Sequence, residues 1–408
     1  MKPDLAIENY DYLANLVNEE FKGCSGIIYT TTVKEVDTLY QELKNRGVRS
    51  GPYHAQMEGE ARSRIHRMWA AGEVKVVVAT IAFGMGIDKS DVRFVIHNTI
   101  SRSMENFYQE SGRAGRDNKP ATCIMLWRLS DVFKQSTMVF TEKTGCEKLY
   151  SMVGYCLNTD TCRRKIIAEH FLESMEDVPC NKMCDNCGKD ENKSEPSVDV
   201  TDYAKAAVGI LKSAAPKEIR VTALKLVEAL QGKGANNIKL AGWKGGKLLK
   251  EQVEQVVALL LVEGYLREDM HYTPYSVISY IVPEERRQIK QVSVKFIDSK
   301  SGGSRSKPSQ VICKEKSKKS AKKRKIESSS EDSDEEPNFG NIKNVNGSSS
   351  RHSKFKESSN KTAQKEKRSC IKSSDEEPDF GNSERSKREK ANFDFGVISS
   401  DDDLNIIL

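Results

Sequence analysis

The first 128 residues alternate between short apolar runs and longer segments in which apolar residues recur every three or four positions. Short runs rich in β-branched residues predict buried strands, and the longer periodicity predicts helices with one apolar face. The predicted strands are 26–30, 75–80, 92–99 and 121–127, and the predicted helices are 33–46, 58–71 and 103–113. Alternating strands and helices, with nearly continuous apolar strands, predict an α/β lobe: a parallel sheet with helices on both faces.

The pattern changes after residue 128 and divides the rest of the chain into three parts. Residues 129–195 are predicted to be mainly helical and are rich in cysteine. Residues 196–290 begin with helical periodicity and end in two strand-like runs around a polar, proline-containing turn, an order typical of a winged helix. From 291 to 408 the composition shifts to Ser, Lys, Glu, Asp and Asn, which predicts a disordered tail because little apolar surface can be buried.

The bulk composition agrees with folded domains followed by a disordered part. Of 408 residues, 37% are apolar and 30% are charged, and the length favours two or three domains. The net charge of +6 is too small to indicate nucleic-acid binding by itself. No apolar run is long enough for a transmembrane helix, so no membrane partner is expected. Ten cysteines and an N-terminus unlike a signal peptide indicate a reducing compartment, where clustered cysteines tend to bind metal.

The most specific string is QESGRAGRD, residues 109–117. Arg113 and Arg116 are three positions apart on a glycine-containing turn, and planar guanidinium groups at this spacing suit the oxygens of a polyphosphate. The small residues between them allow the backbone to approach a ligand closely. A surface turn whose arginines form ion pairs is the alternative interpretation.

Four cysteines follow the pattern C-x17-C-x3-C-x2-C and are Cys162, Cys180, Cys184 and Cys187. Four thiolates suit a closed tetrahedral zinc site with a structural role. Loss of such an ion is expected to unfold residues 129–190, because metal binding supplies folding free energy to a small module. Cys156 and His170 are weaker ligand candidates, and four buried free cysteines are the alternative interpretation.

Two features of the third part suggest contact with DNA. Tyr272 and Tyr275 lie around the turn between the two predicted strands, where an aromatic ring can stack on an unpaired base. Ordinary packing between neighbouring strands is the alternative. The segment 231–250 is basic and glycine-rich, so it is a candidate for contact with the phosphate backbone, with a solvated loop as the alternative.

The tail carries a basic cluster and a repeated acidic motif. The cluster Lys322, Lys323, Arg324 and Lys325 predicts nuclear import, with a solvated charge run as the alternative. The nonamers SDEEPNFGN (333–341) and SDEEPDFGN (374–382) differ at one position and predict short motifs that bind protein partners. Duplication without function is the other interpretation.

Together these strings resemble the RecQ family of ATP-dependent 3′–5′ DNA helicases, most closely its animal Q1-type members. The string 109–117 resembles motif VI of superfamily 2 helicases in its RecQ form. Residues 76–97 resemble motif V, residues 26–39 resemble motif IV, and the resemblance extends from about residue 22 to residue 282. It implies a second RecA-like motor lobe (1–128), a zinc module (129–195) and a winged helix (196–290), in an enzyme that unwinds duplex or branched DNA in repair, recombination and replication.

The resemblance also implies roles for individual residues. In motif VI, Arg116 is the arginine finger, Arg113 supports it and Gln109 faces the nucleotide. The motif V residues that couple the nucleotide to the DNA strand are Thr80, Gly84, Gly86 and Asp88. The four cysteines hold the structural zinc, and an aromatic at the hairpin tip, here Tyr275, separates the strands.

Two elements of a complete motor are not found in the sequence: a phosphate-binding loop of the form GxxxxGK[ST] and an acidic, metal-binding strand. We therefore expect the first motor lobe to be absent, and this chain alone neither to hydrolyse ATP nor to unwind DNA. ATP and magnesium would belong to the complete enzyme. The alternative function is that of a short, non-catalytic form that binds DNA and protein partners through the zinc and winged-helix modules.

Overall fold

The computed structural model describes residues 2–3, 6–84, 88–173, 180–189 and 196–297, together with the backbone of 404–407. These residues belong to one unit of the chain. Gly86, the basic cluster at 322–325 and both acidic nonamers lie outside the described residues.

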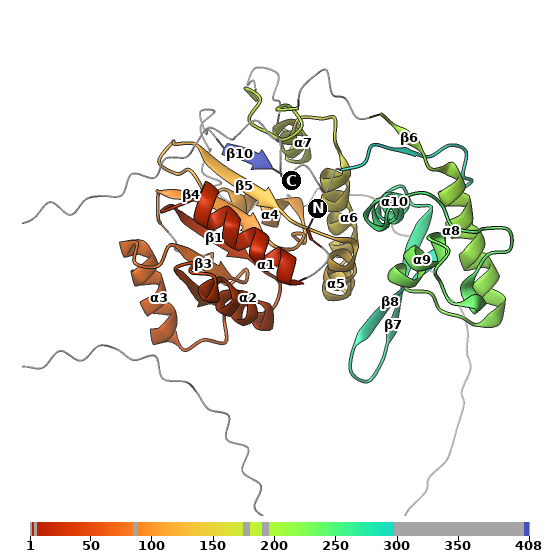
Figure 1. Ribbon diagram of the computed structural model, residues 1–408, viewed down its shortest axis with the longest axis horizontal. Helices are drawn as coiled ribbons and strands as arrows, with labels where there is room; N and C mark the ends of the chain where they lie inside the picture. Colours follow the sequence, from red (N-terminus) through yellow and green to blue (C-terminus); the bar gives the residue numbers. More distant parts are fainter. Residues whose placement is uncertain are drawn as a thin grey trace, which may run out of the picture. The chain divides into compact units, whose positions relative to one another are not determined.

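A parallel sheet forms the centre of the N-terminal part (Figure 1). Its first five strands run in the spatial order β5-β4-β1-β3-β2 and pair in parallel throughout. They are β1 (Ser25–Tyr29), β2 (Ser50–Tyr53), β3 (Val76–Ala79), β4 (Val92–His97) and β5 (Ala121–Met125). The predicted parallel sheet is thus confirmed. Strand β2 was not predicted, because Ser-Gly-Pro-Tyr has weak strand propensity, and its proline is tolerated at the sheet edge.

Helices cover both faces of this sheet, as predicted. They are α1 (Ala6–Asn15), followed by a π-helical turn (Leu16–Glu20), and α2 (Val33–Asn45), α3 (Gly59–Ala71) and α4 (Met104–Ser111). Successive strand residues point to opposite faces. Ile28 therefore packs in a cluster with Leu39 of α2, whereas Ile27 packs in another with Trp69 of α3.

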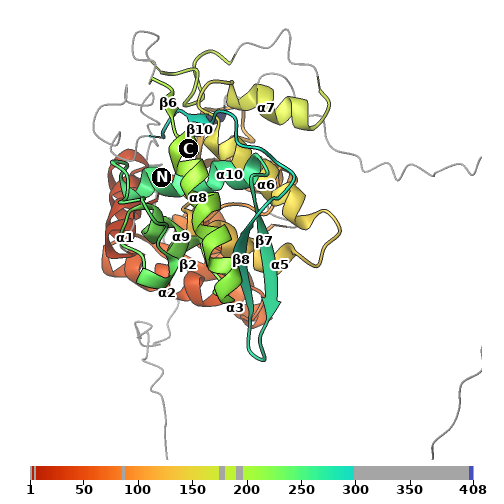
Figure 2. The same cartoon turned by 90° about the vertical axis from the view of Figure 1, so that its right-hand side faces the viewer.

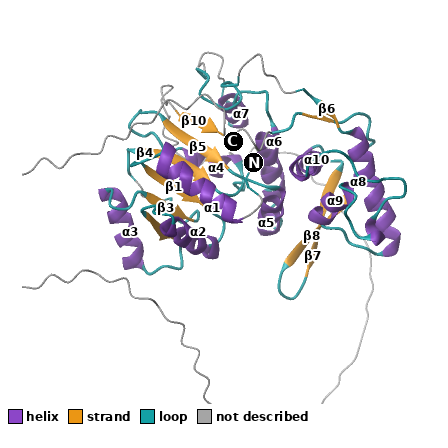
Figure 3. Cartoon of the chain, in the orientation of Figure 1, coloured by secondary structure: helices purple, strands orange, loops and turns teal. Residues whose placement is uncertain are grey.

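Helices and a hairpin make up the second half of the described chain (Figure 3). The helices are α5 (Leu129–Val139), α6 (Gly145–Leu157), α7 (Arg163–His170), α8 (Thr201–Ala214), α9 (Ala223–Leu230) and α10 (Lys250–Val262), with short 3₁₀ turns at Ala215–Lys217 and Asn236–Ile238. The antiparallel hairpin is formed by β7 (Leu266–Tyr272) and β8 (Val277–Pro283). Among the residues that the structure describes, no helix is long and apolar enough to cross a membrane.

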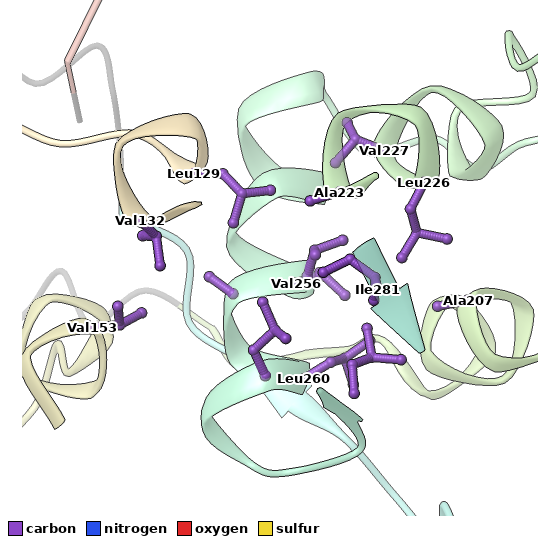
Figure 4. Close-up of a cluster of buried hydrophobic side chains, with 14 of the residues drawn as sticks. Leu129, Val132, Val153, Ala207, Ala223, Leu226, Val227, Val256, Leu260 and Ile281 are labelled. Atoms are coloured by element: carbon purple, nitrogen blue, oxygen red, sulfur yellow. The ribbon is translucent and has the colours of Figure 1, made fainter. Parts of the chain in front are cut away.

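One hydrophobic core joins this second half to the edge of the first (Figure 4). It includes Val132 of α5, Val153 of α6, Val256 of α10 and Ile281 of β8, all almost completely buried. Phe107 of α4 belongs to the same cluster. The hairpin base is therefore held in a core that α5 and α6 share.

Two short strands fall in the segment 291–408, where the composition predicts a tail without structure. Strand β9 (Ser293–Val294) pairs with β6 (Val198–Asp199), just ahead of α8. The folded part therefore extends past residue 290, since β9 closes against the start of the same region. Strand β10 (Leu404–Ile407) pairs in parallel with β5 and adds a sixth strand at the sheet edge. Its sequence, LNII, is an apolar run within an otherwise polar tail.

Candidate functional site

The turn that follows α4 carries the two arginines of the motif VI string. Gly115 has φ +78° and its N–H donates to the Val92 carbonyl at 3.0 Å, so a glycine suits this reversal. The Arg113 side chain turns inward, and its Nη1 donates to the carbonyl of Gly84 at 2.5 Å. A Cβ at Gly84 would lie 2.9 Å from Nη2 of Arg113. The absence of a side chain at Gly84 therefore lets the motif V and motif VI segments meet.

Arg116 lies on the outer side of the same turn. Its side chain is 40% exposed, and its Nη1 is 4.0 Å from the carboxylate of Asp88, which is itself exposed. Gln109 is exposed on α4, and Thr80 is partly exposed just after β3. Of the two guanidiniums, only that of Arg116 is presented to solvent, because Arg113 is buried against Gly84. The structure thus places two of the predicted coupling residues, Gly84 and Asp88, next to the predicted arginine pair.

A buried polar cluster behind this turn was not singled out from the sequence. Glu110 of α4 and His97 at the end of β4 are 2.8 Å apart and both buried. The ring of Tyr29 stacks on His97 with centroids 5.4 Å apart, and the Tyr29 hydroxyl donates to the Phe83 carbonyl at 2.8 Å. Burial raises the pKa of Tyr29 well above its usual value, so it stays a neutral donor. The one sequence signal was that Phe107 and Glu110 share a helical face, which places a carboxylate in an apolar stripe.

The four cysteines of the zinc pattern converge at one point. Their Sγ atoms all lie within 4.8 Å of one another, and those of Cys162 and Cys184 are 3.9 Å apart. Zinc–sulfur bonds of about 2.3 Å in a tetrahedron put sulfurs about 3.8 Å apart, so the cluster fits a zinc ion. The Cys187 N–H donates to Cys184 Sγ at 3.3 Å, which would stabilise a thiolate there. The weaker candidates, Cys156 and His170, are not part of this group.

The electrostatics of the cluster suit a bound cation. Burial raises the pKa of the Cys180 thiol to about 11, and the negative charge of Cys184 adds to this effect. Burial acts in the same direction on Cys162, yet its pKa is lowered, because the Lys165 backbone N–H at the start of α7 donates to its sulfur. The pKa of the Cys187 thiol is also raised, by burial first and then by hydrogen bonds with Cys184 and Cys162. The thiols of Cys180 and Cys187 therefore resist ionisation unless a cation compensates the charge, and a structural zinc would provide that compensation.

A buried ion pair attaches the cysteine loop, residues 180–188, to helices α6 and α7. Arg163, at the start of α7, is 1% exposed and contacts both carboxylate oxygens of Asp185, at 2.9 and 3.0 Å. Its third contact is the carbonyl of Tyr155 in α6. Asp185 lies between two of the ligands, so this pair fixes the register of the loop.

Arg163→Ala is expected to destabilise the protein by about 3–5 kcal/mol, because it leaves the carboxylate of Asp185 buried without a partner. Urea unfolding measures the loss. The matched control is Lys165→Ala on the same helix, whose pair with Glu169 is exposed on both sides and is expected to contribute under about 1 kcal/mol. Equal effects of the two variants would contradict the structural role of the Arg163 pair.

The hairpin tip separates the two candidate tyrosines. The Thr273 N–H donates to the Ser276 carbonyl at 2.8 Å, and its side chain closes the same turn, which leaves Pro274 and Tyr275 at the apex. Tyr275 is 97% exposed. Tyr272 packs against Phe140 at the end of α5, with ring centroids 5.6 Å apart. Tyr275 is thus displayed to solvent, whereas Tyr272 is 65% exposed and has a ring contact with α5.

The glycine-rich segment 231–250 is largely irregular and packs against α8. A Cβ at Gly246 would collide with the Tyr203 ring, and the hydroxyl of Tyr203 accepts a bond from the Leu248 N–H at 2.9 Å. At least two of its glycines therefore have packing roles, since Gly232 likewise lies too close to Lys244 for a side chain. The five lysines of segment 231–250 are all exposed and are Lys233, Lys239, Lys244, Lys247 and Lys250.

The parallel sheet, the arginine turn and the four-cysteine cluster define the C-terminal lobe of a helicase motor joined to a metal-binding module. Comparison with known families agrees. Residues 8–118 match the helicase conserved C-terminal domain, and residues 129–188 match the RecQ zinc-binding domain. The chain belongs to the RecQ family.

Relatives of this chain include ATP-dependent DNA helicase Q1 of Rattus norvegicus, which is 47% identical over 69% of this chain and 45% of its own length. The Mus musculus protein of the same name is 40% identical over 80% of this chain and 55% of its length. The chain therefore spans about half the length of these relatives. Among solved structures, the C-terminal domain of the DEAD-box protein Dbp5 aligns with a TM-score of 0.30 at 21% identity, covering 38% of this chain and 82% of that one.

Proposed function

We propose that this chain supplies the rear motor lobe, the zinc module and the DNA-binding domain of an ATP-dependent 3′–5′ DNA helicase. The observation that carries the proposal is the presence, in one chain, of the arginine turn and the four-cysteine cluster, each matched to its family domain. In the assembled motor, Arg116 would reach the nucleotide held by a P-loop lobe. Arg113 and Gly84 would hold that arginine in place. The sequence contains no P-loop motif of the form GxxxxGK[ST], so we expect ATP and magnesium to bind only in the assembled enzyme.

The zinc ion would have a structural role. The four cysteines would saturate a tetrahedral site and leave no open position for a substrate. This chain's own residues keep the loop in place: Arg163 binds the carboxylate between two ligands, and the backbone N–H of Cys187 donates to a ligand sulfur. The module would therefore support DNA binding by holding its neighbours in place.

We assign residues 196–290 to a winged-helix domain that binds DNA. Helices α8, α9 and α10 precede a hairpin in the order that this fold requires, and the hairpin is its wing (Figure 2). The exposed lysines between α9 and α10 are suited to phosphate contacts, which are salt-dependent. Tyr275 at the tip would stack on the base that is freed where a duplex opens. The substrate would be duplex DNA with a fork or branch, and the basic cluster at 322–325 would direct the protein to the nucleus.

Tyr275→Ala is expected to abolish base unstacking at a fork while changing DNA affinity little, because the stacking energy is offset by the cost of unpairing. A forked duplex with 2-aminopurine in the first pair at the junction measures both. Fluorescence should rise when the purified chain binds, and the rise should be lost in the variant.

Tyr272→Ala is the matched control, because it also removes a tyrosine side chain, three residues before the tip. The ring of Tyr272 contacts Phe140. This variant keeps the tyrosine at the tip and loses only the contact with Phe140, so it should retain more of the fluorescence change than Tyr275→Ala. An undiminished rise in Tyr275→Ala would contradict the strand-separating role. Absence of fork binding by the wild-type chain would contradict the assignment of a DNA-binding domain.

A further inference from the structure

A single carboxylate, that of Glu268, connects the hairpin to two helices of the preceding module. Glu268 lies near the base of β7. The Ser136 hydroxyl of α5 donates to its Oε2 at 2.6 Å, and the Tyr150 hydroxyl of α6 donates to its Oε1. The Ser279 hydroxyl of β8 donates to Oε2 as well. Three hydroxyls from three different elements therefore converge on one side chain.

Both oxygens of the Glu268 carboxylate accept hydrogen bonds from these three hydroxyls. No ion pair of Glu268 occurs among the residues that the structure describes. A half-buried carboxylate is costly without partners, and each of its oxygens has a donor here. Ser136 is completely buried, and burial together with the nearby Glu268 charge raises the pKa of Tyr150, which keeps its proton available for donation.

A ring contact lies on the same face of the hairpin. Side chains at 268, 270 and 272 point to one side of β7, and Tyr272 meets Phe140 of α5. Ser136 and Phe140 are one helical turn apart, so α5 offers one contact to the base of the hairpin and one nearer its tip. Both Figure 1 and Figure 2 show the hairpin extending beyond the helices to which its base is attached.

We propose that Glu268 is a positioning residue that fixes the β7–β8 hairpin against α5 and α6 and so holds its tip in one place. A two-stranded hairpin alone is marginally stable in water, so its order depends on such external contacts. The consequence for strand separation rests on the proposed function. The anchoring itself does not depend on it.

The test measures hydrogen exchange of the hairpin amides, residues 270–282, in the full chain. Glu268→Ala is expected to speed their exchange about tenfold or more, because it removes several hydrogen bonds to a charged group. Tyr150→Phe removes one donor without disturbing the fold and should give a smaller increase in the same peptides. The control is Asp269→Ala, which removes the neighbouring carboxylate from the opposite, exposed face of β7 and should change nothing.

A second readout separates this proposal from the assignment of the hairpin tip. If the wild-type chain raises 2-aminopurine fluorescence at the fork, Glu268→Ala should reduce that rise while zinc content and fork affinity stay within about twofold of wild type. If Glu268→Ala speeds amide exchange but even the wild-type chain gives no fluorescence signal, the anchoring role of Glu268 is supported and the strand-separating role of the tip is refuted. Unchanged exchange in both Glu268→Ala and Tyr150→Phe would overturn the anchor.

Discussion

Removal of zinc is expected to release residues 158–173 and 180–188 from their folded arrangement while α5 and α6 stay in place. The reason is the unequal distribution of apolar contacts. Leu149 and Val153 of α6 lie in the large core shared with α10, so these helices keep most of their stabilisation without metal. The cysteine loop has few such apolar contacts, so it depends on the metal for its stability. Metal binding is worth roughly 10–16 kcal/mol in isolated zinc-finger peptides. The sequence alone had suggested unfolding of all of 129–190, and the core argues for this narrower effect.

Chelation followed by thermal melting and hydrogen exchange measures this effect. After the metal is removed, a low-temperature transition should appear, with fast exchange confined to the loop and α7. Cys184→Ala should reproduce the chelated state, because the variant removes the most buried ligand. Cys146→Ala is the matched control, since this cysteine lies outside the cluster. An unchanged melting curve after complete loss of zinc would contradict a structural role for the metal.

The features that sequence predicted well are those that short-range pattern determines. Strands such as Val76–Ala79 are continuously apolar, and the close spacing of Cys180, Cys184 and Cys187 keeps these three ligands together in one short loop. Strand β2 was not predicted because its Ser-Gly-Pro-Tyr sequence has no apolar pattern of its own. It forms a strand by pairing with β3 in the sheet. Pattern alone cannot reveal a strand whose stability comes from its partner.

The polar contacts between distant segments could not be predicted either, because local sequence does not show which residues far apart in the chain become partners. Glu268 and Ser136 are 132 residues apart, and nothing in either local sequence marks them as partners. The inward turn of Arg113 depends likewise on the missing side chain of Gly84, 29 residues earlier. The sequence indicated that both arginines mattered, but the division between a buried and an exposed guanidinium appears only once the two segments are brought together.

That division predicts different outcomes for the two arginines in an enzyme assembled with a P-loop lobe. Arg116→Ala is expected to lower DNA-stimulated ATP turnover about a thousandfold and leave folding unchanged, because its guanidinium is exposed and arginine fingers contribute at this scale. Arg116→Lys should recover little, since a point charge does not reproduce the planar donor geometry. Arg113→Ala should also lower the melting temperature, because Arg113 is buried and bonded to Gly84.

Phosphate release by the two-lobed protein, with and without single-stranded DNA, measures these differences. Lys119→Ala is the matched control, because this side chain lies on the same turn and is 72% exposed. The chain by itself is expected to release no phosphate above background. Hydrolysis by the isolated chain that disappears in Arg116→Ala would mean that it binds and cleaves the nucleotide without a P-loop, and would overturn the proposed division of labour between two lobes. Full turnover in the assembled Arg116→Ala enzyme would instead remove Arg116 from the nucleotide site and leave the fold and the zinc module unaffected.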